Sequence, residues 1–185
     1  MGDTFQTIVD REASITDAEH TASEIVGWLV KLGIVNPSPT DCVLSTKRKG
    51  YRPGPNYRNV VAVRDEHDDH TLGLRVNGLE VVLGRTVFDA GQYGLGLVCR
   101  KCGSHIDGGD AWSDAVGEWH EGGGGYFACP KCGYAESVSE WSYDPAWGFG
   151  NLGFQFWNWP PFKPSFVTEF TQRLGHQTVL VRGKT

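Results

Sequence analysis

Two Cys-x-x-Cys pairs are the residues of this chain whose types and spacing most clearly indicate chemistry. Cys99 and Cys102 form the first pair, Cys129 and Cys132 form the second, and a glycine follows each pair. Two intervening residues let the chain turn so that both sulfurs of a pair face one ion, and the glycine permits the positive φ that turns backbone N–H groups towards the sulfurs. Four thiolates close a tetrahedral shell, which predicts one structural Zn²⁺ held by these four cysteines.

The segment around these pairs resembles the zinc-ribbon family. The resemblance covers about residues 95–140 and rests on two repeats, Cys99-Arg100-Lys101-Cys102-Gly103 and Cys129-Pro130-Lys131-Cys132-Gly133. It implies two knuckles on β-hairpin turns that hold one zinc ion. Zinc ribbons serve many functions, so the resemblance describes how this segment is stabilised more than what the protein does.

A contiguous group of acidic residues and histidines is a second metal-binding candidate, Asp65-Glu66-His67-Asp68-Asp69-His70. Imidazole and carboxylate ligands could hold a catalytic divalent cation, which would make the protein a metal-dependent hydrolase. A polar turn between two strand-like segments explains the group more simply. The sequence contains no His-Glu-x-x-His motif, no Gly-x-Ser-x-Gly motif and no complete phosphate loop, so we favour a non-enzymatic protein.

Charge is distributed unevenly around a formal net charge of -5. The segment 46–59 contains tyrosines and five cations that could contact nucleic-acid phosphates, Lys47, Arg48, Lys49, Arg52 and Arg58. Residues 110–121, inside the ribbon, are expected to form a helix with aromatic and acidic residues on opposite faces. We predict that this helix contributes a partner-binding surface, with Trp112, Trp119, Asp114 and Glu118. An ordinary solvated loop and an ordinary solvated helix face are the simpler interpretations.

The leading functional interpretation is a non-enzymatic protein-interaction protein with one structural zinc site made by the four cysteines, of the type of small acidic bacterial immunity proteins or antitoxins. Nucleic-acid binding by the basic segment and metal-dependent hydrolysis by residues 65–70 are the alternatives. The N-terminus lacks a signal-peptide pattern, and no stretch is long and apolar enough to cross a bilayer. Paired thiols without a secretion signal favour a reducing compartment, so we expect a cytoplasmic location, no membrane contact and a protein partner.

Hydrophobic periodicity predicts the elements that position these residues. Helices are expected at 17–32 and 165–174, with Gly33 and Gly175 at their C-terminal ends. An aromatic segment at 136–159 contains one strand face that alternates with period two, formed by Leu152, Phe154 and Phe156. A final strand is expected at 177–181.

Other parts of the chain give weaker or more local signals. Asn77-Gly78 predicts a β-hairpin between residues 71–76 and 79–83. Residues 1–14 show no clear period and are expected to form a loosely held arm. The fifth cysteine, Cys42, is expected to be a small buried hydrophobe and not a nucleophile.

Together these elements predict an α+β protein in which N- and C-terminal helices cover a mostly antiparallel sheet. Residues 1–94 and 141–185 are expected to form one α+β domain, and residues 95–140 an inserted zinc-ribbon subdomain. A chain of 185 residues is long enough to bury an adequate core for this arrangement.

Overall fold

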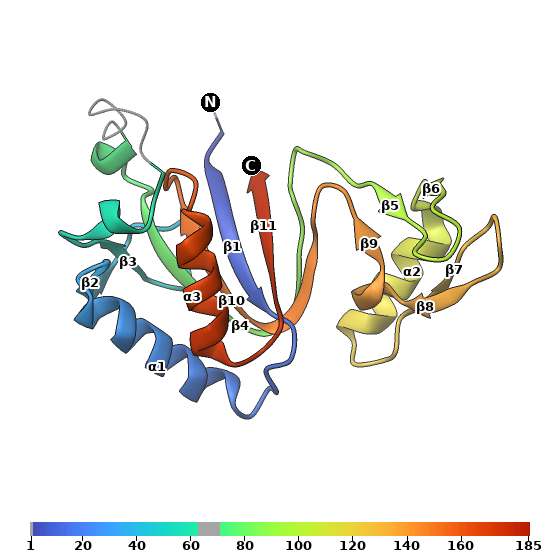
Figure 1. Cartoon of the computed structure of the whole chain (residues 1–185), viewed down its shortest axis with the longest axis horizontal. Helices are drawn as coiled ribbons and strands as arrows, with labels where there is room; N and C mark the ends of the chain where they lie inside the picture. The colour runs from blue at the N-terminus through green and yellow to red at the C-terminus, as the bar shows by residue number, and fades with distance from the viewer. Residues whose placement is uncertain (1, 63–70) are drawn as a thin grey trace.

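A six-stranded sheet forms the main part of the molecule in a computed structural model, which describes residues 2–62 and 71–185 (Figure 1). Its strands are β1 (Thr4–Asp10), β2 (Val35–Thr40), β3 (Gly50–Pro53), β4 (Gly78–Phe88), β10 (Gly148–Trp157) and β11 (Thr178–Lys184). The strand order is β11-β1-β10-β4-β3-β2, and every neighbouring pair is antiparallel. The predicted α+β class with an antiparallel main sheet is confirmed.

Strand β1 lies inside the sheet, between β10 and β11, so the expectation of a loose N-terminal arm is wrong. Its polar residues Gln6, Thr7 and Asp10 are buried, which conceals the alternation that normally marks a strand. The Gln6 side-chain amide donates to the carbonyl of Pro160 at 2.7 Å, and its oxygen accepts the N–H of Phe162 at 3.1 Å. The strand is therefore stabilised by groups that lie far from it in the sequence.

Helices α1 (Ala18–Lys31) and α3 (Pro164–Leu174) cover one face of this sheet (Figure 1). Both helices were predicted, and both end at glycines in the left-handed region, Gly33 with φ 71° and Gly175 with φ 72°. The main core lies between the helices and the sheet, and its largest fully buried side chains include Phe154, Phe156, Phe170, Ile25 and Leu29. Within the described residues, no helix combines the length and apolar character that crossing a bilayer requires.

The hairpin predicted at Asn77-Gly78 is not formed, because β4 begins at Gly78 and pairs with β3 and β10. The Asn77 N–H donates to the Cys42 carbonyl at 2.9 Å. The Asn77 side-chain amide donates to the carbonyls of Thr71 at 2.9 Å and Asn158 at 3.1 Å. The asparagine thus links three distant segments and does not close a local turn.

The opposite face of the sheet carries a smaller apolar cluster. Its members are Phe5, Val9, Cys42, Val43, Val82, Phe88, Trp157 and Val181. Cys42 is fully buried among them, which agrees with its expected role as a small hydrophobe.

The cysteine-containing part of the chain is inserted between β4 and β10. The chain leaves the sheet at Phe88 and returns at Gly148, and these two residues are β-sheet partners. Between them lie β5 (Leu97–Val98), β6 (His105–Ile106), α2 (Gly109–His120), β7 (Tyr126–Ala128), β8 (Ala135–Ser137) and β9 (Ser142–Tyr143). Their own apolar cluster runs from Leu97 to Phe149, beyond the boundary expected at residue 140. The division into domains stays a prediction.

Candidate metal centre

Two similar β-hairpins present the four cysteines. The first pair lies in the turn between β5 and β6, and the second lies in the turn between β7 and β8. In the first turn, the Cys99 N–H donates to the Ser104 carbonyl at 3.0 Å; in the second, the Cys129 N–H donates to the Tyr134 carbonyl at 2.8 Å. Corresponding positions therefore make corresponding hydrogen bonds, as expected for two knuckles around one ion.

The glycine after each pair closes its turn. Gly103 has φ 70° and Gly133 has φ 73°, a region that residues with a Cβ rarely adopt. The N–H of each glycine donates to the carbonyl of the first cysteine in its pair, Cys99 or Cys129, at 2.8 Å in both cases. No atom lies within 4 Å of a Cβ built on either glycine, so backbone conformation and not space selects glycine there.

The four sulfurs fit one tetrahedral ion. A Zn–S bond of about 2.3 Å places tetrahedral sulfurs about 3.8 Å apart. The Sγ atoms of Cys99 and Cys132 are 3.7 Å apart, those of Cys102 and Cys129 are 3.9 Å apart, and all four lie within 4.8 Å of one another. Among the described residues, this is the one group of three or more His, Cys, Asp or Glu side chains that could hold a metal ion. His105 and His120 are exposed and not part of it.

The thiols differ in exposure and in acidity. Cys99 and Cys129 are buried, whereas Cys102 and Cys132 are exposed. Hydrogen bonds from the side chain and backbone of Ser104 lower the pKa of Cys102 to about 6. The backbone of Tyr134 lowers the pKa of Cys132, but desolvation and the neighbouring thiols outweigh this effect and raise it to about 11. Cys102 is therefore the thiol that ionises most readily, which favours it as the first ligand to bind a cation.

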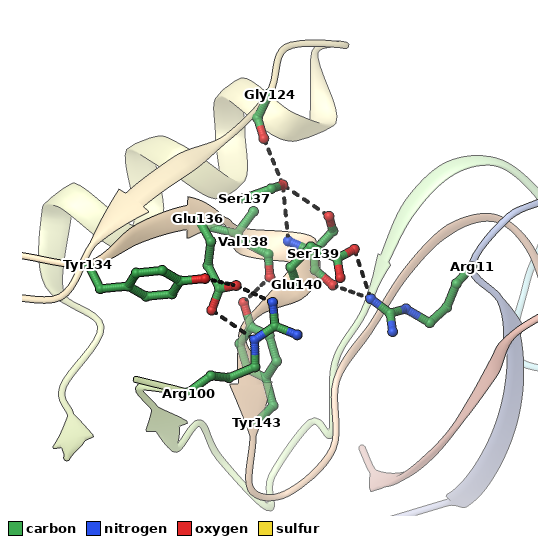
Figure 2. A network of polar contacts seen from close by, with 10 residues as sticks. All are labelled: Arg11, Arg100, Gly124, Tyr134, Glu136, Ser137, Val138, Ser139, Glu140 and Tyr143. Atoms are coloured by element: carbon green, nitrogen blue, oxygen red, sulfur yellow. Dashed lines mark hydrogen bonds and ion pairs between the residues drawn. The ribbon is translucent and has the colours of Figure 1, made fainter. Parts of the chain in front are cut away.

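A buried carboxylate joins the two knuckles (Figure 2). Glu136, on β8, is buried and pairs with Arg100 from the first knuckle, whose Nε donates to Oε1 at 3.1 Å and whose Nη2 also contacts Oε2. The Tyr134 hydroxyl donates to the same carboxylate at 3.4 Å. Arg100 thus fixes the relative position of the hairpins, a role that the cysteine spacing did not reveal.

Two further arginines attach this region to the main sheet. Arg11, which follows β1, donates through Nη2 to the Ser139 carbonyl at 2.8 Å and to Glu140 Oε1 at 3.0 Å (Figure 2). Arg85, on β4, donates to the Gly123 carbonyl at 3.1 Å and to the Trp119 carbonyl, with its guanidinium 4.0 Å from the centre of the Trp119 ring. Arg85 therefore binds carbonyls at the C-terminal end of α2, where a helix has free acceptors.

The residues predicted to contact a partner fall on two faces of α2. Trp112 and Trp119 are buried in the apolar cluster, whereas Asp114 and Glu118 are exposed. The predicted amphipathic helix is therefore present, and its accessible surface is the acidic side. Partner binding itself stays a prediction.

The predicted nucleic-acid contacts are dispersed, and part of their charge is already paired. The Arg48 Nε donates to Glu80 Oε1 at 2.7 Å, and Arg52 donates to backbone carbonyls near β4 at 3.3–3.4 Å. Lys47, Lys49 and Arg58 are exposed. The group at 65–70 lies outside the described residues.

Comparisons with models of protein families, with curated proteins and with solved structures find no match to this chain. The fold and site therefore define the protein only as an α+β protein with a four-cysteine cluster that could hold one metal ion. The likeness to zinc ribbons rests on the two knuckles alone.

Proposed function

We propose that this protein is a zinc-stabilised, non-enzymatic interaction protein. The observation that supports the proposal most directly is the convergence of four thiols from two similar hairpins, with sulfur separations that suit one Zn²⁺. Four protein ligands leave no coordination position for a substrate or a reactive water, so such an ion has a structural role.

The elements around the cluster are short, which explains why a metal would be needed there. β5, β6 and β9 have two residues each, and β7 and β8 have three. Hairpins of this length are marginal without further support. A bound zinc ion joins both hairpins and contributes its binding free energy to their folding.

The acidic side of α2 is the surface that we propose for partner binding. Its exposed acidic residues are Asp110, Asp114, Glu118 and Glu121, including the residue that ends the helix. The buried indoles of Trp112 and Trp119 hold the helix against the cluster, so this acidic surface is already ordered before binding. A rigid anionic surface suits a partner protein with a basic patch, which includes a basic toxin.

Elemental analysis of the purified full chain tests the metal site. We expect about one zinc per chain, and loss of zinc in Cys129→Ser, since that ligand is buried at the centre of the cluster. Cys42→Ala is the matched control, because Cys42 is also buried but lies in a different apolar cluster. Zinc retained by Cys129→Ser, or lost from Cys42→Ala, would contradict the proposed ligand set.

Charge reversal on α2 tests the partner surface. Co-purification of tagged protein from its own cells should recover a basic partner that binds less tightly at high salt. The variant Asp114→Lys/Glu118→Lys should lose this partner, whereas Glu19→Lys/Glu24→Lys, an equal charge change on exposed residues of α1, should retain it. Equal recovery by both variants would place the interaction elsewhere.

A further inference from the structure

A row of polar side chains crosses the sheet on the face away from the helices. Thr7 on β1 pairs with Gln155 on β10, and Gln155 pairs with Glu80 on β4. Their sequence neighbours, including Ile8, belong to the core under the helices, and alternation along a strand places these three on the opposite face. A polar row in the middle of an otherwise apolar sheet face needs hydrogen-bond partners.

Glu80 has its partners within the protein. Its side chain is 3% exposed, and its two oxygens accept from Arg48 Nε at 2.7 Å and from Trp157 Nε1 at 2.9 Å. Neither terminal nitrogen of Arg48 has a hydrogen-bond partner among the described residues. Glu80 therefore holds the guanidinium by its Nε and leaves the terminal fork, which suits a carboxylate or phosphate, without a ligand.

Thr7 and Gln155 lack side-chain partners. The Thr7 hydroxyl is completely buried and makes no hydrogen bond within the part of the chain that the structure describes. The Gln155 amide, which is half-buried, likewise makes none with any described residue. A buried hydroxyl without a partner is unfavourable by itself, so its presence beside a cavity points to a bound polar group.

These side chains line one cavity of about 340 Å³. Its apolar walls include Phe5, Phe88 and Trp157, and Lys184 lines it from β11. A Cβ built on Gly153 would come within 2.4 Å of the Phe88 ring, so this glycine lets the ring lie flat against the sheet. Asp89 also lines the cavity, but its Oδ1 accepts the Gly91 N–H at 2.7 Å. The volume suits a small molecule.

We propose that this cavity binds a small organic anion with an aromatic body. The terminal fork of Arg48 binds its carboxylate or phosphate, and Lys184 is a second cation for the same group. The rings of Phe5, Phe88 and Trp157 contact its body, while Thr7 and Gln155 hydrogen-bond its polar atoms. This site is separate from the cysteine cluster and does not depend on the partner surface of α2.

Titration followed by NMR tests the proposal on the full chain. Benzoate, phenylacetate and indole-3-acetate are the anionic probes, phenylacetamide is the neutral match to phenylacetate, and inorganic phosphate lacks an apolar body. We expect saturable shifts of the Trp157 indole N–H and the Gln155 amide with at least one carboxylate, at submillimolar to millimolar concentration. Phenylacetamide and phosphate should each bind at least tenfold more weakly than that carboxylate.

Variants separate a built site from non-specific contact. Arg48→Lys keeps the charge beside Glu80 but loses the fork, and it should weaken binding about tenfold. Thr7→Val removes only a hydroxyl without a partner, so it should fold and bind several-fold more weakly. Lys47→Gln, an exposed neighbour of Arg48, is the control and should bind as tightly as the wild type. Absence of saturable shifts with all three carboxylates, or equal binding by Arg48→Lys and the wild type, would overturn the proposal.

Discussion

Replacing Arg48 with methionine tests how strongly the sheet depends on compensation of the buried Glu80 charge. Methionine keeps most of the aliphatic stem of arginine, so the change removes the guanidinium with little loss of packing. The carboxylate would keep only one of its two donors, Trp157 Nε1 at 2.9 Å. The variant is therefore expected to be destabilised mainly by an uncompensated charge.

The expected magnitude follows from the exposure of the two partners. Breaking a buried ion pair costs about 3–5 kcal/mol. The Glu80 side chain is 3% exposed, but the Arg48 side chain is 49% exposed, so water can partly replace the guanidinium. We therefore expect Arg48→Met to lower the free energy of unfolding by about 3 kcal/mol, at the lower end of that range.

A second substitution distinguishes the charge from lost contacts. In Arg48→Met/Glu80→Met the carboxylate is gone, and the main remaining defect is the Trp157 N–H without an acceptor, about 1–2 kcal/mol. The double variant should therefore be more stable than Arg48→Met by about 1–2 kcal/mol. Urea unfolding at neutral pH measures all three proteins. Arg52→Met, which loses only long hydrogen bonds to carbonyls, should lose less than about 1 kcal/mol. A double variant less stable than Arg48→Met would refute the reasoning.

Three further outcomes can be measured by thermal or chemical unfolding. Gly133→Ala should cost about 1–2 kcal/mol because its φ is 73°, while Gly117→Ala, on open space within α2, should stabilise by about 0.5–1 kcal/mol; equal effects would show that the knuckle does not need a positive φ. Thr7→Val should stabilise the ligand-free protein by about 1 kcal/mol, because it removes a buried hydroxyl that has no partner among the described residues; a loss of stability would reveal a partner for that hydroxyl. The hydrogen bond to Asp10 raises the pKa of His176, so its stabilising contribution is complete below about pH 6.5 and is lost as the pH rises through the raised pKa. Discounted for a side chain that is 36% exposed, the stability difference between the wild type and His176→Ala should shrink by about 0.5–1 kcal/mol between pH 5.5 and pH 9, and a widening difference would contradict this sign.

The features predicted correctly from the sequence are those with a local cause. The spacing of Cys99 and Cys102 and the glycine after them depend on one turn, and the structure repeats this turn at the second pair. The alternation of Leu152, Phe154 and Phe156 marks a strand because one face of β10 lies under two helices. The faces of α2 follow from helical spacing in the same way.

The features that were missed depend on distant partners. Asn77-Gly78 satisfies the rule for a hairpin turn, but Asn77 forms its hydrogen bonds with Cys42, Thr71 and Asn158. Strand β1 was missed because polar residues such as Gln6 are buried in it, each with partners more than a hundred positions away. Pairing of this kind leaves no pattern within a short window of sequence.

Similarly, the basic segment gave no sign that Arg48 is held by Glu80. The positive charges at 47–49 are adjacent in the sequence, yet only Arg48 of the three has a buried carboxylate beside it. The roles of Arg11, Arg85 and Arg100 were missed for the same reason, since each contacts a segment that folds against it from elsewhere.

The central position of β1 also sets the order in which parts of the protein can form during synthesis. β1 is the first strand to be made, and its two neighbours, β10 and β11, are the last two. The four cysteines and both of their hairpins lie between them, so the segment that holds the metal is complete before β1 has any partner. Until residues 148–157 emerge, β1 remains a strand with two open edges, which makes the growing chain dependent on protection from wrong pairing at that stage.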